Sequence, residues 1–277
     1  MRFNKYFKNI SGCNLASKIE FAHSMDNGSS NKPIYALFAH YFTGSKDVTI
    51  INRLSRALLK HNIVLFRFDH MGLGQSQGNF ADSNFSTNVE DIISAVDFMY
   101  EEYKTYPSCL IGHSFGGPAV ICAANKIAQK NKSSEVDIMS NKKNINSIIT
   151  IGSPSDTSHV SHHFNDYIDE INSKGETVVS LSGREFKFKK QFLQDINSQD
   201  IDSNISSLNK PIMIMHSPFD NVVSIDHAKK IYELAKHPKN FISLDNTDHL
   251  VSKNNSDVSY IADMIVPFIK RYHASCN

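Results

Sequence analysis

The sequence of 277 residues has little of what marks a membrane protein, a secreted protein or a nucleic-acid-binding protein. Its formal net charge is only +1 and long basic runs are absent, which argues against nucleic acid or an anionic membrane surface as the main partner. No segment approaches the roughly 20 apolar residues of a membrane span, and no apolar stretch of signal-peptide length follows the basic residues of segment 1–10. We therefore expect a cytoplasmic protein that acts on a small neutral molecule, with its oligomeric state, a homodimer included, left open.

Cysteine is scarce, and its spacing argues against two kinds of site. Cys13, Cys109, Cys122 and Cys276 show no CxxC spacing, and two of them lie on predicted core elements. This favours free thiols in a reducing compartment over zinc or a disulfide framework. The glycines of segment 69–76 form neither GxGxxG nor a glycine loop ending in GK[ST], which favours a tight structural turn over a phosphate cradle. We predict neither a metal nor a cofactor.

What the chain does have is a regular alternation of two patterns. Short, almost continuous apolar runs predict buried parallel strands, and apolar residues at helical spacing predict helices that pack on them. The predicted strands are 18–22, 34–39, 63–68, 109–111, 147–152, 212–215 and 241–244, and the predicted helices are 47–61, 89–100, 118–128, 224–236 and 258–268. We also predict a turn at 26–28, a capping box at 87–90 and a polar surface loop at 131–144. The alternation predicts one α/β domain, residues 1–277, with a doubly wound, mostly parallel sheet.

One motif stands out at the junction of a predicted strand and a predicted helix, Gly112-x-Ser114-x-Gly116. A strand that turns sharply into a helix forces the central residue into strained dihedrals, so its neighbours must lack side chains. The serine hydroxyl then stands alone above the end of the strand. The amino end of the helix and the N–H of Phe115 face the place where an oxyanion would form. The pattern is typical of a nucleophile elbow.

A nucleophilic serine needs a base and an acid elsewhere in the chain, because the hydroxyl is a weak nucleophile until a base removes its proton. In elbow enzymes the order along the chain is serine, acid, histidine. Asp220 and His249 supply this order, each on a loop that follows one of the last two predicted strands. Asp245 and Asp248 are weaker candidates for the acid, since residues so near the base in sequence hold its ring in poor geometry.

Other histidines fit the base less well. His113 adjoins the serine in sequence and is expected to project away from it, His216 is on the wrong loop, and His273 is near the terminus. The second oxyanion donor should come from the loop after the predicted strand 34–39. There the N–H of either Phe42 or Tyr41 can serve.

Segment 155–209 interrupts the alternation. It contains a helix-like stretch at 160–171, a hairpin at 177–188 that turns at 182–184, and a short helix near 191–196. In the second strand of the hairpin, the period of two puts Phe186 and Phe188 on one side and charged residues on the other. An insertion at this place projects over the strand ends, so we predict a lid.

Three histidines in this segment, His159, His162 and His163, raise the alternative of a metal site. They have no matched carboxylate or cysteine partners nearby in the sequence. We therefore interpret them as a polar face of the lid.

With these motifs in place, the chain resembles the α/β-hydrolase superfamily and, more closely, bacterial serine hydrolases that are often fused to an OsmC-like domain. The likeness spans nearly the whole chain and is carried by ALFAHYFT at 36–43, FD at 68–69 with GLG at 72–74, NFSTNVED at 84–91, GHSFG at 112–116, HSPxD at 216–220, AKHPK at 235–239, and SLD and DH within 243–249. The resemblance implies a triad of Ser114, Asp220 and His249, with the N–H groups of Phe42 and Phe115 as the oxyanion site.

The leading functional prediction is a serine carboxylic-ester hydrolase that acts on small, short-chain acyl esters through an acyl-enzyme. Amide or peptide hydrolysis, acyl transfer and perhydrolysis on the same triad are alternatives. A non-catalytic binding protein that keeps the fold is an alternative of a different class.

Overall fold

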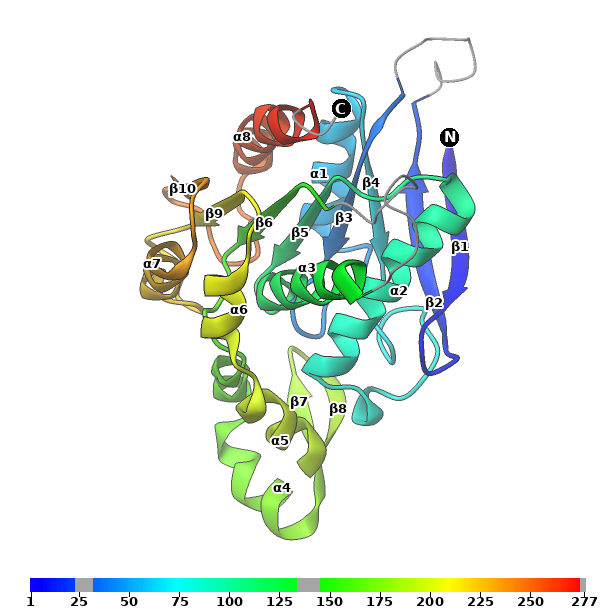
Figure 1. The fold of residues 1–277 in the computed structure, drawn as a ribbon. Helices are drawn as coiled ribbons and strands as arrows, with labels where there is room; N and C mark the ends of the chain where they lie inside the picture. Colours follow the sequence, from blue (N-terminus) through cyan, green and yellow to red (C-terminus); the bar gives the residue numbers. More distant parts are fainter. Residues whose placement is uncertain (23–31, 134–144, 275–277) are drawn as a thin grey trace.

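The computed structural model describes residues 1–22, 32–133 and 145–274. The predicted turn at 26–28, most of the predicted loop at 131–144, and Cys276 lie outside these residues. Within them, one sheet has eight strands in the order β1-β2-β4-β3-β5-β6-β9-β10 (Figure 1). Their bounds are Arg2–Lys8 (β1), Asn14–Glu20 (β2), Ile34–Ala39 (β3), Ile63–Phe68 (β4), Cys109–His113 (β5), Ser147–Ile151 (β6), Ile212–His216 (β9) and Lys239–Ser243 (β10).

The pairing confirms a mostly parallel sheet. Strands β3 to β6, β9 and β10 are parallel to their neighbours in that group, and only β1 and β2 run against the strands beside them. Every residue of β4 and β5 is buried. Helices therefore cover both faces of the central strands, which explains why apolar residues predominate in their sequences.

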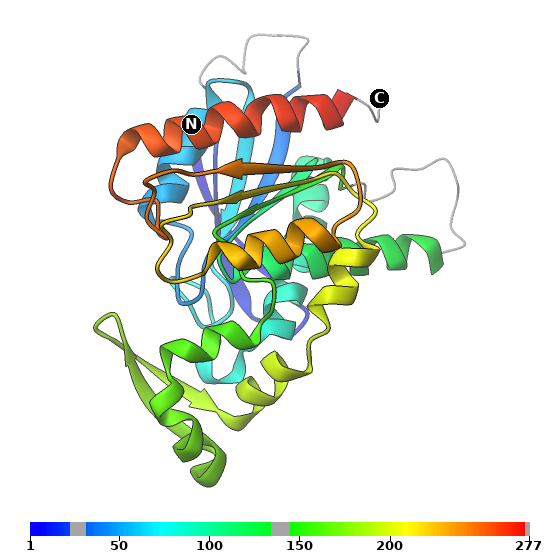
Figure 2. The same ribbon diagram turned by 90° about the vertical axis from the view of Figure 1, so that its left-hand side faces the viewer.

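The helices form a layer on each face of the sheet, as Figures 1 and 2 show. Helices α1 (Thr49–Leu59) and α8 (Asn255–Ala274) cover one face and share a buried cluster with it. Helices α2 (Phe85–Tyr103), α3 (Gly116–Ser133) and α7 (Ile225–Leu234) cover the other face and share the second cluster. The predicted doubly wound α/β fold is thus confirmed.

The structure differs from the sequence-based expectation at the amino end. Strand β1 is not predicted, because it is an edge strand on which exposed and buried positions mix and only Phe7 is fully buried. The predicted strand 18–22 is displaced, since β2 begins at Asn14 and is held to β1 along its whole length.

The predicted capping box at 87–90 is also wrong. Helix α2 begins earlier, with Asn84 as its N-cap, and Thr87 is the third residue of the box rather than the first. The Asn84 side chain accepts the N–H of Thr87 at 2.9 Å, and the Thr87 hydroxyl accepts the N–H of Asn84 at 2.8 Å. An asparagine caps as well as a threonine does, and the buried Phe85 draws the first turn into the core.

The insertion lies beyond one end of the sheet (Figure 1). It consists of two short 3-10 turns, η3 (Ser158–His163) and η4 (Asn165–Tyr167), then α4 (Ile168–Lys174), the hairpin β7 (Glu176–Leu181) and β8 (Arg184–Lys189), α5 (Lys190–Ser198) and α6 (Ile201–Ser207). The helix expected over 160–171 is mostly 3-10 turns, and α6 is not predicted. The hairpin agrees with the expectation.

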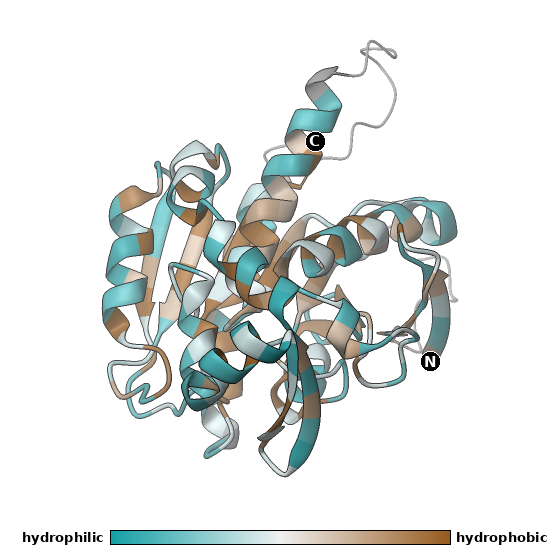
Figure 3. Ribbon diagram, turned by 90° about the horizontal axis from the view of Figure 1, so that it is seen from below, coloured by the Kyte–Doolittle hydropathy of each residue, from teal (hydrophilic) through white to brown (hydrophobic). Residues whose placement is uncertain are grey.

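The alternation predicted for β8 is present. Phe186 and Phe188 are buried, whereas Glu185 and Lys187 are exposed. Hydrophobic and hydrophilic bands alternate along the hairpin in Figure 3 as well. Helix α5 is tied to the start of α2, because Asp195 accepts the N–H and the hydroxyl of Ser86 at 2.9 and 2.6 Å.

A buried ion pair joins the loops that follow β3 and β4. The Lys46 ammonium lies 2.8 Å from Asp69, whose carboxylate is fully buried and also accepts the N–H groups of Lys46 and Gln75. Gly74 has φ +55°, and a Cβ there would lie 2.3 Å from the Asp69 carboxyl carbon. The glycine loop is therefore a structural turn wrapped around Asp69, as the sequence predicts.

Replacing Lys46 by methionine would leave the Asp69 carboxylate buried without its cation. We expect the free energy of unfolding to fall by about 3–5 kcal/mol, the cost of removing one partner of a buried ion pair, as measured by urea denaturation. The control is Lys18→Met, which breaks the more exposed pair between Lys18 and Asp47 and should cost about 0–1 kcal/mol. Equal losses in the two variants would contradict this account of Lys46.

Candidate active site

The candidate nucleophile, Ser114, sits at the junction of β5 and α3 with φ +53°, a conformation that residues with side chains rarely adopt. Its N–H donates to the Ile151 carbonyl at 2.8 Å. The backbones pack so closely here that a Cβ on Gly112 would lie 2.3 Å from the Gly116 carbonyl oxygen, and one on Gly116 would lie 2.4 Å from the Ala39 carbonyl oxygen. A side chain at either position would clash with neighbouring backbone atoms, so both positions of the motif require glycine.

The structure brings the predicted serine, acid and base together. His249 Nε2 lies 2.9 Å from Ser114 Oγ, and His249 Nδ1 lies 2.7 Å from Asp220 Oδ2. Since an ionised carboxylate only accepts hydrogen bonds, His249 carries its proton on Nδ1 and presents the Nε2 lone pair to the serine hydroxyl. Ser114 and His249 are each 8% exposed, so water has little access to this chain of hydrogen bonds.

The Asp220 carboxylate is held in its ionised form. Burial by itself would raise the pKa of Asp220, but the hydrogen bond from His249 and those from the N–H groups of Val222 and Val223 outweigh it, and the pKa lies below its usual value. A carboxylate at this position stabilises the positive charge that a protonated imidazole would carry.

The alternative acids are occupied elsewhere. Asp248 accepts the N–H groups of Ser252 and Lys253, and Asp245 accepts the hydroxyl of Ser243. Each therefore organises its own turn, whereas Asp220 contacts the ring of the candidate base.

His113 has a position that the sequence pattern does not reveal. Its ring is fully buried, and its Nε2 lies 2.8 Å from the carbonyl oxygen of His249, so it contacts the main chain of the candidate base. Burial, followed by the nearby His249, lowers the pKa of His113 to about 3. The ring is therefore neutral at pH 7 and acts as a structural donor.

The loop after β3 carries the candidate oxyanion donors. The Tyr41 carbonyl accepts two hydrogen bonds, from the N–H of Gly44 at 2.9 Å and from His40 Nδ1 at 2.8 Å. The His40 Nε2 atom accepts the N–H of His70 at 3.3 Å, which fixes the tautomer of the His40 ring. Because the Tyr41 carbonyl and the Phe42 N–H belong to one planar trans peptide, fixing the first directs the second the opposite way, out of the turn.

A cavity of about 440 Å³ opens at the candidate nucleophile. It is lined by Ser114 and His249, by residues 41–43 of the loop after β3, and by residues from the insertion, among them His163, residues 180–182 and Arg184 of the hairpin. The His163 ring stacks on Phe42, with centroids 6.2 Å apart. The insertion thus contributes walls to the cavity, and His163 does so in a way that its sequence context does not signal.

Of the other two histidines of the predicted lid face, His159 contacts a different segment. His159 Nε2 lies 2.9 Å from the Val222 carbonyl oxygen, close to the candidate acid, and its ring packs against those of His162 and His227. Within the part of the chain that the structure describes, no group of three or more histidine, cysteine or carboxylate side chains is arranged to hold a metal ion.

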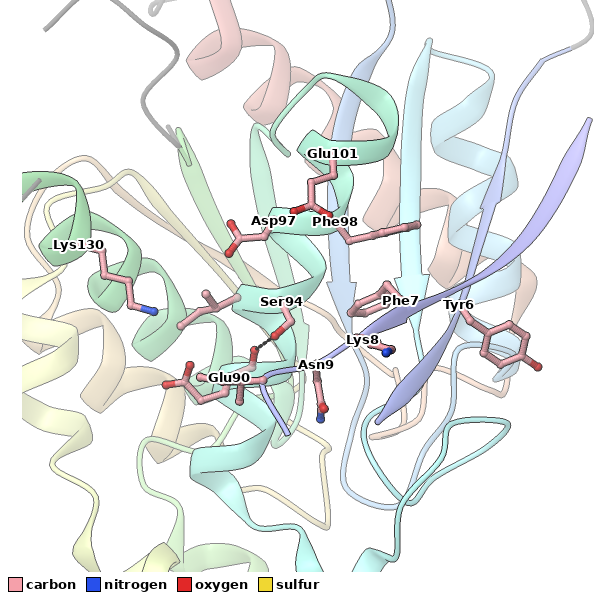
Figure 4. Close-up of a pocket in the computed structure, with 12 residues that line it drawn as sticks. Tyr6, Phe7, Lys8, Asn9, Glu90, Ser94, Asp97, Phe98, Glu101 and Lys130 are labelled. Carbon is pink, nitrogen blue, oxygen red and sulfur yellow. Dashed lines mark hydrogen bonds between the residues drawn. The ribbon is translucent and has the colours of Figure 1, made fainter. Parts of the chain in front are cut away.

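A second hollow, of about 540 Å³, lies between β1 and α2 (Figure 4). Its walls carry Glu90, Asp97, Glu101 and Lys130, and the hydroxyl of Ser94 donates to the Glu90 carbonyl at 2.8 Å. It shares no lining residue with the cavity at the candidate nucleophile. The candidate chemistry therefore belongs to the first cavity.

Comparison with known proteins agrees with the fold and with this geometry. The chain is 32% identical to the esterase domain of a Rhodothermus marinus protein, with 98% of this chain and 99% of that chain covered and a TM-score of 0.73. The chain belongs to the α/β-hydrolase superfamily. Residues 45–136 match the family Hydrolase_4, described as serine aminopeptidase S33.

Two curated relatives have lower sequence identity to this chain. Human monoglyceride lipase is 24% identical over 226 residues, which cover 74% of this chain and 72% of the lipase. The uncharacterized protein YfhR of Salmonella typhimurium is 25% identical over 216 residues, or 77% of this chain. The chain spans only 64% of the length of YfhR. These relatives include proteins of the esterase and lipase type.

Two further expectations concern the chain as a whole. Cys13, Cys109 and Cys122 are free thiols, as the spacing predicts. In the described ranges, no helix has both the length and the apolar character needed to cross a membrane.

The neutral His40 gives the stability a defined pH dependence. Burial, followed by the neighbouring His70, lowers the pKa of His40 to about 3, while an unfolded histidine titrates near 6.5. As the pH falls from 7.5 to 5, the unfolded chain binds a proton at this residue and the folded chain does not, so stability falls. We expect this residue to contribute about 2 kcal/mol of that loss.

Urea denaturation at the two pH values measures the effect. The variant His40→Gln should lose about 2 kcal/mol less than the wild type over this interval, while His61→Gln, at an exposed histidine, should follow the wild type. An unchanged pH dependence in His40→Gln would rule out the buried, neutral state of this ring.

Proposed function

We propose that the protein is a serine hydrolase that cleaves small carboxylic esters with Ser114 as nucleophile, His249 as base and Asp220 as the orienting acid. The observation that supports this most directly is the continuous chain of hydrogen bonds, 2.9 Å and 2.7 Å long, that ends at a serine on the wall of a cavity. The likeness to an esterase domain and to a monoglyceride lipase supports the same class of reaction.

The reaction begins with proton transfer. His249 Nε2 removes the hydroxyl proton as Ser114 Oγ attacks the ester carbonyl, and the ionised Asp220 stabilises the imidazolium that forms. The carbonyl oxygen becomes an oxyanion. We assign its two donors to the N–H groups of Phe42 and Phe115.

The choice of Phe42 over Tyr41 rests on the direction of one peptide. Because the Tyr41 carbonyl is held by His40 and Gly44, the N–H of Phe42 faces away from the turn and stays available to a ligand. The N–H of Phe115 lies at the amino end of α3, where the helix dipole favours negative charge.

The second half of the reaction regenerates the serine. The imidazolium returns its proton to the leaving alkoxide oxygen as the carbon–oxygen bond breaks, which releases the alcohol and leaves an acyl-enzyme. A water molecule, deprotonated by His249, then attacks the acyl carbonyl. The bond to Ser114 Oγ breaks, the imidazolium returns the proton to Oγ, and the acid is released. No step requires a cofactor. The size of the cavity suits a short acyl ester, and we propose that the insertion at 155–209 acts as its lid.

Removing the Ser114 hydroxyl tests the mechanism. We expect Ser114→Ala to lower kcat/KM for p-nitrophenyl butyrate by at least about a thousandfold, because no other group takes over the covalent step. The same variant should lose labelling by a fluorophosphonate probe. Circular dichroism checks that it is folded.

A matched control is Ser198→Ala, at an exposed serine on α5 whose hydroxyl donates only within its own helix. It should retain both turnover and labelling. Turnover or labelling that survives in Ser114→Ala would remove this serine from the mechanism. A folded wild type that neither reacts with the probe nor hydrolyses esters would favour a binding protein.

A further inference from the structure

The tip of the insertion hairpin places a cation on the wall of the candidate cavity. Ser182 and Gly183 both have positive φ, +50° and +76°, which closes a two-residue turn between β7 and β8. Arg184 follows this turn directly, pairs with Leu181 across the ladder, and lines the same cavity as Ser114 and His249.

Two contacts hold the guanidinium in place. Arg184 Nη2 donates a hydrogen bond to the Thr43 carbonyl oxygen, and the guanidinium carbon lies 5.0 Å from the centre of the Phe186 ring. Thr43 is the neighbour of Phe42, so the cation is anchored beside the proposed oxyanion donor. A guanidinium has five N–H donors in a planar fork, and the contact with Thr43 uses one corner of it.

The cations of strand β8 differ in their partners. Lys187 pairs with Glu176 at 2.7 Å, and Lys189 pairs with Asp82 at 2.5 Å. For Arg184, the described portion of the chain supplies no carboxylate within ion-pairing distance. A positive charge that has no counterion among these residues, held on the wall of a binding cavity, is suited to an anionic ligand group.

The rest of the cavity wall does not compensate this charge. Among the described residues, those that line it include no aspartate or glutamate, and Arg184 is the only permanently charged side chain there. Burial, followed by neighbouring histidines, lowers the pKa of His163, which favours the neutral form of this ring. The remaining walls are hydroxyl-bearing or apolar, from residues such as Tyr41, Ser180 and Leu250.

We propose that Arg184 is a specificity residue that binds a carboxylate carried by the ester substrate, away from the ester bond that is cleaved. The inference rests on the proposed function and narrows its substrate class to short esters that bear a carboxylate. A carboxylate matches the planar fork of a guanidinium and can accept two parallel N–H groups from it. This departs from the neutral substrate that the composition of the chain suggests.

Two matched pairs of esters test the proposal. One pair places the carboxylate on the acyl part of the substrate, and the other places it on the alcohol part. Monoethyl adipate is compared with diethyl adipate, and 4-carboxyphenyl butyrate with phenyl butyrate, with acid or phenol release followed by chromatography. We expect the wild type to prefer the anionic member of at least one pair. In that pair, Arg184→Gln should lower kcat/KM for the anionic ester by about 10–100-fold, mostly through KM, and change the neutral ester less than about threefold.

Two further variants serve as references. Arg184→Lys keeps the charge without the fork and should retain part of the preference, and Lys187→Gln, on the same strand but paired with Glu176, should behave as the wild type. If Arg184→Gln lowers kcat/KM equally for the anionic and the neutral esters, the guanidinium only fastens the hairpin to Thr43 and the inference is overturned.

Failure of the inference is distinguishable from failure of the proposed function. If the wild type hydrolyses the neutral esters and Arg184→Gln has no effect on the anionic ones, the inference alone is overturned. If the wild type hydrolyses none of the four esters, the proposed function falls and takes the inference with it.

Discussion

The close approach of three backbones at the turn from β5 into α3 is the constraint on which the site depends. Gly112 and Gly116 lie so near their neighbours that no side chain fits at either place, and this packing holds Ser114 at a φ of +53°. The strain is sustained because β5 lies in the middle of a sheet that is buried on both faces. The serine is thereby fixed at the edge of the sheet where strands β3, β9 and β10 end and the loops that follow them begin.

A set of supporting hydrogen bonds holds the candidate triad and the loop after β3 in position. His113 contacts the main chain of His249, the N–H groups of Val222 and Val223 hold Asp220, and His40 with Gly44 holds the Tyr41 carbonyl. These are main-chain contacts, made by buried and neutral groups or by backbone amides. A site arranged in this way keeps its donors and acceptors aimed before any ligand arrives, which is what electrostatic stabilisation of a transition state requires.

Much of this arrangement could be predicted from sequence where a local pattern carries it. Strands β3 and β4 begin and end where their mostly apolar runs do, because most of their positions are buried. The buried Arg67 of β4 is the charged exception, and it pairs with Glu20 at 2.6 Å. The order of Ser114, Asp220 and His249 along the chain predicts their meeting, since parallel strands end at one edge of the sheet. Strand β1 escaped prediction because an edge strand with one buried face toward a helix has no continuous apolar run.

Other features depend on contacts between distant segments, which no local pattern records. The choice between Tyr41 and Phe42 turns on the orientation of a peptide that His40 fixes. The environment of Arg184 depends on how the hairpin meets the loop after β3. The alternation of buried and exposed side chains along β8 could still be predicted, because successive side chains of any strand point to opposite faces.

The hydrogen bonds between the insertion and the rest of the fold are unequally distributed between α5 and the hairpin tip. At α5, Asp195 accepts two hydrogen bonds from Ser86, and Gln191 accepts one from Asn84. At the hairpin tip, a single side chain, Arg184, reaches across to the main chain of Thr43. If the insertion acts as the proposed lid, we expect opening to begin on the guanidinium side, because a swing of the tip about α5 breaks fewer of these hydrogen bonds than a lift of the whole insertion.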